Sequence, residues 1–179
     1  NDDLYPVAPC RREDFFRDGK GVIWFSSHMI VSGMYKHICK NSDSYARKAL
    51  GMKPSWKFIR PQHTCTPMLK SECEKLYEIL KDDILVSLTR TRTQDNLNQY
   101  LFLDYQYYKG LMIDEKISNK HFSVALASPV KLYDYILNPS RNLMCVNDVN
   151  LKENRYEALR DAMHRAFEKK FPSKSRFEK

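Results

Sequence analysis

The sequence predicts a helix-rich α/β fold. Apolar residues recur at helical spacing along residues 68–80 and 156–167, which indicates amphipathic helices. Residues 143–146 form a compact apolar run that ends abruptly in Asn147 and Asp148, as a buried strand does. Shorter apolar runs between turn formers predict further strands.

The first third of the chain is expected to hold few regular elements. Residues 4–27 are rich in turn formers and charge, with a short strand predicted at 22–25. Residues 32–50 fit one or two short helices that Gly51 ends. Residues 56–59 are then extended.

Two longer helices are predicted next. Pro67 suits the first position of a helix that ends near Asp82. A second helix begins after Thr93 or Asp95, either of which can cap it, and runs to Gly110. Its aromatic face is interpreted as core.

The last third alternates between the two kinds of element. Strands are predicted at residues 111–113, 122–126 and 143–146, and helices at 130–137 and 156–167. The chain has 179 residues, of which 42% are hydrophobic, so one core and a single domain over 1–179 are expected. Because it opens on Asn-Asp-Asp without a methionine, we interpret it as part of a longer protein.

Composition narrows the cellular setting and the partners. The formal net charge of +8 suits an anionic partner such as a nucleotide diphosphate, a nucleic acid or a membrane surface. The five cysteines include no C-x-x-C pair and are interpreted as reduced thiols of a cytoplasmic protein. No stretch reaches the roughly 18 apolar residues of a membrane span, so membrane contact is expected to be peripheral, at the inner face of the cell membrane.

Acidic and amide side chains at two places suggest a metal site. Asp148 follows a buried strand, where open α/β sheets bind their ligands. A strand upstream of Asp2 and Asp3 would place them similarly, and we predict that both clusters share one cleft. With Asn147, these oxygen donors suit Mg²⁺ or Mn²⁺. The alternative, that both clusters are ordinary turns, stays open.

Three further residues can act on a phosphorylated substrate. His63 lies between an extended segment and a helix, and histidine is the natural general base at neutral pH. Arg90 and Arg92 can clamp a pyrophosphate, because the guanidinium fork matches phosphate oxygens. A structural histidine and two ordinary surface arginines remain the alternatives.

These motifs occur together in one family. The opening residues 1–7 with 14–16 resemble the end of the second conserved region of Stealth proteins. The third is matched by residues 62–67, the helix after them, Arg92, Asp95, Asn98 and the aromatic stretch 100–108, and the fourth by residues 145–148, a helix and residues 171–178. The family includes bacterial capsule polymerases and the animal phosphotransferase that tags lysosomal glycoproteins.

The resemblance implies the C-terminal part of a Rossmann-like or nucleotide-sugar-transferase-like fold, whose first strands precede this chain. It also implies transfer of a hexose 1-phosphate from a nucleotide diphosphate sugar to a glycan hydroxyl, with a divalent ion, in capsule or cell-surface polysaccharide synthesis. The implied catalytic residues are His63, Arg92, Asp3 and Asp148; the substrate-binding residues Arg90, Arg92, Asp95, Asn98 and Asn147; and the metal ligands Asp2, Asp3, Asn147 and Asp148.

Two other functions are weighed against this one. A metal-dependent glycosyltransferase would use the same residues and differ only in its leaving group. A basic nucleic-acid-binding module would need exposed aromatics interleaved with Lys and Arg, whereas the aromatics here lie at core spacing, so no nucleic-acid partner is expected.

Overall fold

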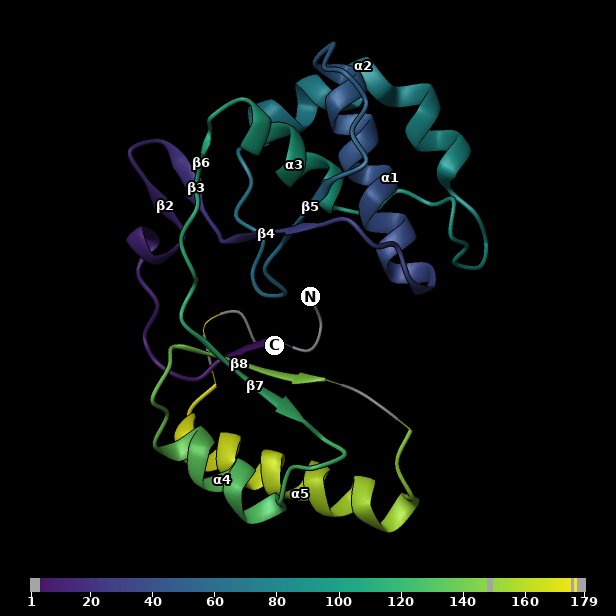
Figure 1. Ribbon diagram of the computed structural model, residues 1–179. Helices are drawn as coiled ribbons and strands as arrows, with labels where there is room; N and C mark the ends of the chain where they lie inside the picture. Colours follow the sequence, from purple (N-terminus) through teal and green to yellow (C-terminus); the bar gives the residue numbers. More distant parts are fainter. Residues whose placement is uncertain (1–3, 148–149, 175, 177–179) are drawn as a thin grey trace. The chain divides into compact units, whose positions relative to one another are not determined.

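A computed structural model describes residues 4–147, 150–174 and 176. They form a mixed α/β fold, which confirms the predicted class (Figure 1). The chain divides into two compact units. Unit 1 contains the N-terminal segment up to Cys10 and the residues from Ser118 onward, and unit 2 is Arg11–Ile117. The single domain over 1–179 stays a prediction, and each unit is described by itself.

Unit 1 is built on a sheet with strand order β1-β8-β7, formed by Leu4–Pro6, Leu143–Asn147 and Asn119–Ser123. The central strand, β8, is parallel to β7 and antiparallel to β1. Its first four residues are buried, as the apolar run predicts. The strand predicted at 122–126 ends earlier, because the Ala127 N–H turns back to donate to the Ser123 carbonyl at 2.8 Å.

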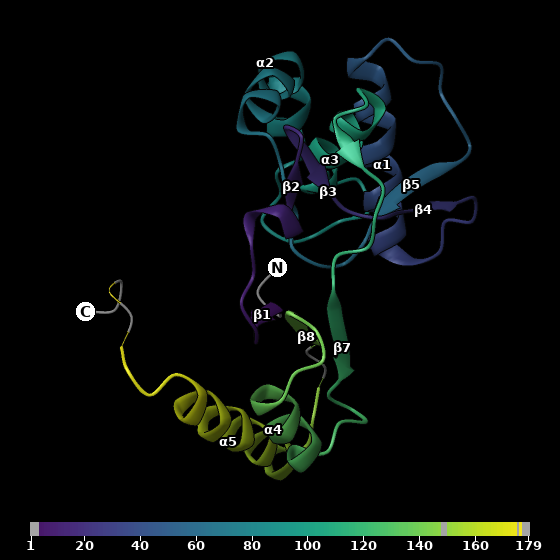
Figure 2. The same ribbon diagram turned by 90° about the vertical axis from the view of Figure 1, so that its left-hand side faces the viewer.

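Helices α4 (Pro129–Leu137) and α5 (Glu153–Lys170) lie side by side against this sheet (Figure 2). The Ser128 side chain caps α4 by accepting the Lys131 N–H at 3.3 Å. The buried core that joins helices and sheet contains Leu132, Ile136, Met144, Val146, Leu159 and Ala166.

Unit 2 contains α1 (Gly33–Ala49), α2 (Lys70–Ser87) and α3 (Tyr100–Tyr108). The segment predicted as one or two helices is thus a single helix, α1. Apolar side chains from all three helices meet in one cluster: Ala46, Leu76, Leu80, Leu101 and Tyr105.

The strands of unit 2 form two small sheets. Strand β4 (Phe25–His28) pairs antiparallel with β5 (Phe58–Pro61). The second sheet has the order β2-β3-β6, from Phe16–Arg17, Lys20–Val22 and Met112–Ile113, and the turn η1 (Arg12–Asp14) precedes it. The single strand predicted at 22–25 is wrong, because this segment is shared between β3 and β4, which pair with different partners.

Tertiary contacts move the start of α2. The predicted start at Pro67 is wrong, because the Leu69 N–H donates to Gln106 Oε1 at 2.8 Å and holds the chain outside the helix. A Cβ at Gly21 would lie 3.0 Å from the Pro67 carbonyl oxygen, so the backbones pack closely here. The predicted end at Asp82 is also wrong, since α2 continues to Ser87 across a kink at Leu80.

Helix α3 starts later than Thr93 or Asp95 would allow. Asn98 Oδ1 accepts the Tyr100 N–H at 3.0 Å and takes the place of the predicted caps. The preceding loop is held irregular by Asn96, which accepts the Thr93 N–H at 2.7 Å and donates to the Ser87 carbonyl at 2.5 Å.

Candidate functional site

The C-terminal end of β8 carries an unsatisfied oxygen. Asn147 Oδ1 is buried and has no hydrogen-bond partner among the residues that the structure describes. Antiparallel pairing, with Leu4 opposite Cys145, brings the beginning of β1 beside the end of β8. Asp2 and Asp3 precede Leu4 in the sequence, and Asp148 follows Asn147, but all three lie outside the described residues. The shared cleft therefore stays a prediction.

The described residues contribute one fitting ligand to the predicted metal site. Within residues 4–147, 150–174 and 176, no group of three or more His, Cys, Asp or Glu side chains could hold a metal ion. The unpartnered amide oxygen of Asn147 suits Mg²⁺ or Mn²⁺, which prefer oxygen donors. The remaining predicted donors are the three aspartates outside the described part.

His63 is exposed on a bend directly after β5. Three hydrogen bonds fix its neighbour Gln62. The Gln62 backbone N–H donates to the Trp24 carbonyl at 2.7 Å. The Gln62 side chain accepts the Ile117 N–H at 3.0 Å and donates to the Ile117 carbonyl at 3.1 Å. The exposed His63 therefore lies next to an anchored backbone, which is a suitable position for a general base.

Arg90, Arg92 and Asp95 lie in loop 88–99, between α2 and α3, and all three are exposed. Their side chains make no hydrogen bond or ion pair with any described residue. The two guanidinium groups are therefore available to an anionic ligand, and either can supply the bidentate fork that a phosphate accepts.

Loop 88–99 is attached to α1. Asn41 Nδ2 donates to the Gln94 carbonyl at 2.8 Å, and the Ser42 hydroxyl lies 3.0 Å from Asn98 Oδ1. Asn98 Oδ1 thus contacts the Ser42 hydroxyl of α1 and also accepts the Tyr100 N–H at the start of α3. Its predicted role in substrate binding stays a prediction.

The predicted site residues occupy three places. Arg90, Arg92, Asp95 and Asn98 share one loop, whereas His63 follows β5 in the same unit. Asn147 belongs to unit 1.

Sequence reasoning assigned no individual role to Arg60 or Gln62, although Gln62 begins the motif of residues 62–67. Both belong to the segment around His63, but only the structure shows that the Gln62 amide fixes the backbone. Arg60 lies two residues after Phe58 on β5. Because side chains two residues apart point to the same face of a strand, this spacing places a cation and a buried ring on one face. This two-residue spacing is the sequence signal from which the position of Arg60 could have been predicted.

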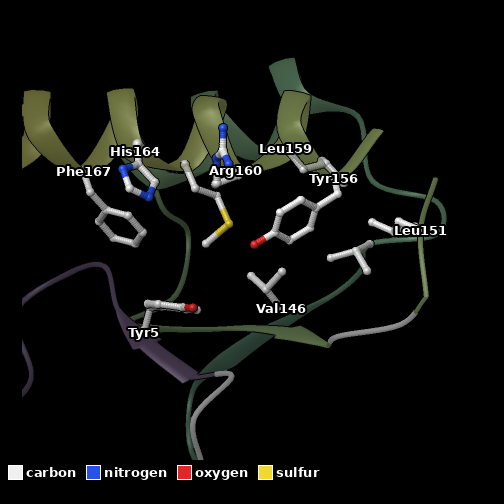
Figure 3. Close-up of a pocket in the computed structure, with 10 residues that line it drawn as sticks. Tyr5, Val146, Leu151, Tyr156, Leu159, Arg160, His164 and Phe167 are labelled. Atoms are coloured by element: carbon white, nitrogen blue, oxygen red, sulfur yellow. The ribbon is translucent and has the colours of Figure 1, made fainter. Parts of the chain in front are cut away.

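A pocket of about 340 Å³ lies between α5 and the sheet of unit 1 (Figure 3). The Tyr156 hydroxyl points into it above Val146, and Tyr5, Met163 and Phe167 complete its apolar wall. Side chains alternate along a strand, so Asn147 faces the opposite side of the sheet from Val146. The pocket and the unsatisfied oxygen therefore do not form one site.

None of the helices in the described part of the chain is long and apolar enough to cross a membrane.

Comparison with curated proteins points to one class, bacterial capsular polysaccharide phosphotransferases. One relative, capsular polysaccharide phosphotransferase WcwK of Streptococcus pneumoniae, is 29% identical over 121 residues, which are 65% of this chain and 35% of the relative. A second protein of that name and species is 28% identical over 120 residues, 66% of this chain and 34% of its own length. No protein-family model matches the chain.

The chain spans about a third of the length of the curated relatives that it matches. This similarity confirms the resemblance to Stealth proteins inferred from the sequence motifs.

Proposed function

We propose that this chain is part of an enzyme that transfers a sugar phosphate during the synthesis of a capsular or other cell-surface polysaccharide. The similarity to the two pneumococcal phosphotransferases carries the proposal. The exposed His63 supports it, as do Arg90 and Arg92, which have no partner among the residues that the structure describes, because all three suit a phosphorylated substrate.

The donor in this proposal is a nucleotide diphosphate sugar, and the acceptor is a glycan hydroxyl. The acceptor oxygen attacks the sugar-side phosphorus and forms the new phosphodiester, while the bond from that phosphorus to the bridging oxygen breaks. His63 takes the hydroxyl proton, and a nucleoside monophosphate leaves. Arg92, or Arg90 in its place, contacts the phosphate oxygens.

Asn147 would help to hold a divalent cation, with Asp2, Asp3 and Asp148 as the other ligands. The buried Oδ1 of Asn147, which has no hydrogen-bond partner in the described part of the chain, supports this assignment. When bound, Mg²⁺ or Mn²⁺ would neutralise charge on the diphosphate.

The released nucleotide tests the reaction type. The full-length protein is incubated with a nucleotide sugar, a glycan acceptor and Mg²⁺, and the spent nucleotide is separated by chromatography. We expect a nucleoside monophosphate, together with a phosphodiester signal in the phosphorus NMR spectrum of the product. Release of a nucleoside diphosphate, with no phosphodiester formed, would replace the proposal with a glycosyltransferase that attacks the anomeric carbon.

A further inference from the structure

In unit 2, the half-buried side chains of Arg60 and Lys36 have no counter-charge among the described residues. Arg60 lies on β5, and Lys36 lies in the first turn of α1. Neither side chain makes a hydrogen bond or an ion pair with any residue in the described part of the chain. Two cations without a counter-charge can attract an anionic ligand.

His28 is held on the same face of the β4–β5 pair as Arg60. Ser26 lies directly opposite Arg60, and residues opposite each other in an antiparallel pair point to one face. His28 follows two positions later on that face. The Ser26 hydroxyl donates to the Arg60 carbonyl at 3.1 Å and lies 2.9 Å from His28 Nε2, which fixes the imidazole beside β5.

The spacing suits a small ligand. Arg60 and His28 are diagonal neighbours across the strand pair, a relationship that corresponds to about 7–8 Å between backbones. Both side chains can therefore approach one tetrahedral anion.

The charges of Arg60 and Lys36 reach His28. Burial lowers the pKa of His28 below its ordinary value, and the positive charges of Arg60 and then Lys36 lower it further. The first turn of α1 contains Lys36 but no acidic residue, and Ser32 makes no side-chain cap, so the helix end adds positive potential.

Arg47 is a half-buried cation of the same unit whose charge is paired. It donates to Asp43 Oδ2 at 2.9 Å and to the Tyr108 hydroxyl at 2.6 Å, and its charge is thereby satisfied within unit 2. Arg60 has no such partner among the described residues. The contrast between Arg47, which is paired, and Arg60, which has no partner among the described residues, fits a ligand as the partner of Arg60.

We propose that Arg60, Lys36 and His28 bind a phosphate group, presented either as a phosphomonoester or as the phosphodiester of a glycan. The Arg60 fork accepts two phosphate oxygens, and Lys36 and His28 complete the charge balance. This site goes beyond the proposed function: it does not use His63, Arg90 or Arg92, and its binding can be measured without turnover.

Calorimetric titration of the protein with inorganic phosphate, at an ionic strength held constant with chloride, tests the site. Arg60→Gln and Lys36→Gln should each lower the affinity at least tenfold. Lys57→Gln is the matched control, because Lys57 is an exposed cation on the same segment whose contact is with the Trp56 ring. Lys36 lies outside the sheets, so its variant keeps the test valid if Arg60→Gln fails to fold.

Absence of saturable phosphate binding would overturn the proposal, as would equal losses in Lys57→Gln and Arg60→Gln. NMR of the His28 ring gives an independent readout. A bound phosphate should raise the pKa of His28, since an opposite charge favours the imidazolium. An unchanged His28 titration at saturating phosphate would also contradict the site. A sugar 1-phosphate and a phosphodiester-linked disaccharide, compared in the same assay, distinguish the two sources.

Discussion

Ser42 of α1 and Asn98 of loop 88–99 contact each other in both directions. The Asn98 N–H donates to Ser42 Oγ at 3.2 Å, and that hydroxyl lies 3.0 Å from Asn98 Oδ1. Asn98 Oδ1 also accepts the Tyr100 N–H. One amide thus joins α1, the loop that contains Arg90 and Arg92, and the start of α3.

The first prediction concerns this junction. Asn98→Ala should lower the free energy of unfolding by about 1 kcal/mol, because α3 loses its cap. Ser42→Ala should act in the same direction, and the double variant should lose less than the sum of the two, as expected for residues in contact. Urea denaturation measures all three, with the exposed Asp95→Ala as a nearly neutral control. Strict additivity would show that the contact does not stabilise the junction.

The second prediction concerns catalysis. In the full-length enzyme, His63→Ala should lower turnover by about 10²-fold or more, because the acceptor hydroxyl loses its base. The fold should remain intact, since hydrogen bonds of the Gln62 side chain anchor this segment to Ile117. His121→Ala removes an exposed histidine from β7 and serves as the control. Near-normal turnover in His63→Ala would assign this histidine a structural role.

The third prediction concerns Asp104, a fully buried residue of α3 whose two carboxyl oxygens have no hydrogen-bond partner among the described residues. Burial raises the pKa of Asp104 well above its ordinary value; the charge of Asp43 adds to this, and Arg47 opposes it. The unfolded chain loses this proton near pH 4, at about the ordinary pKa of 3.9, whereas the folded chain keeps it to higher pH.

Stability should therefore fall as the pH rises from about 4 toward the raised pKa of Asp104. Asp104→Asn should increase the free energy of unfolding at pH 7 and flatten this decline. Denaturation at a series of pH values measures both effects, and the exposed Asp82→Asn should change neither. An undiminished decline in Asp104→Asn would exclude Asp104 as its cause.

The fourth prediction concerns Glu72, which links α2 to α3. Its carboxylate pairs with Lys109 and, at 2.7 Å, with Lys75, and these hydrogen bonds lower its pKa. The resulting stability is fully present above the unfolded pKa of about 4.3 and is lost as the pH falls through the lowered pKa of the folded state.

Glu72→Gln should therefore lower the free energy of unfolding at pH 7 by about 1–2 kcal/mol, and the difference should shrink in acid. Thermal denaturation at pH 7 and pH 3 measures it. The control is Glu74→Gln, because the Glu74–Lys70 pair is largely exposed and should contribute little. Equal effects of the two variants would contradict the linking role of Glu72.

Local patterns predicted the existence of several elements. The apolar run of residues 143–146 corresponds to β8, and the apolar stripe of residues 156–167 corresponds to α5. The predicted boundary of a helix was wrong where a residue distant in the sequence determines it. The Gln106 side chain holds Leu69 outside α2, and no pattern near Pro67 contains that information.

The residue types of the candidate site could be predicted from the sequence. The long-range contacts that hold those residues in place could not. The motif around His63 identified a histidine after an extended segment, and the structure places it after β5. The anchoring of Gln62 by Ile117 joins residues 55 positions apart. The pairing of β1 with β8 spans most of the chain and depends on only three residues of β1. Contacts between residues so far apart in the sequence produce no periodic pattern from which they could be predicted.

The pairing of β1 with β8 also bears on how the protein is made. Unit 2 is one continuous stretch, Arg11–Ile117, whereas unit 1 joins segments from both ends of the chain. A ribosome synthesises the whole of unit 2 before it synthesises β7, β8, α4 or α5. During translation, unit 2 can therefore fold first, while β1 waits without its partner strand. Any factor that shields a nascent edge strand would act here on Leu4–Pro6.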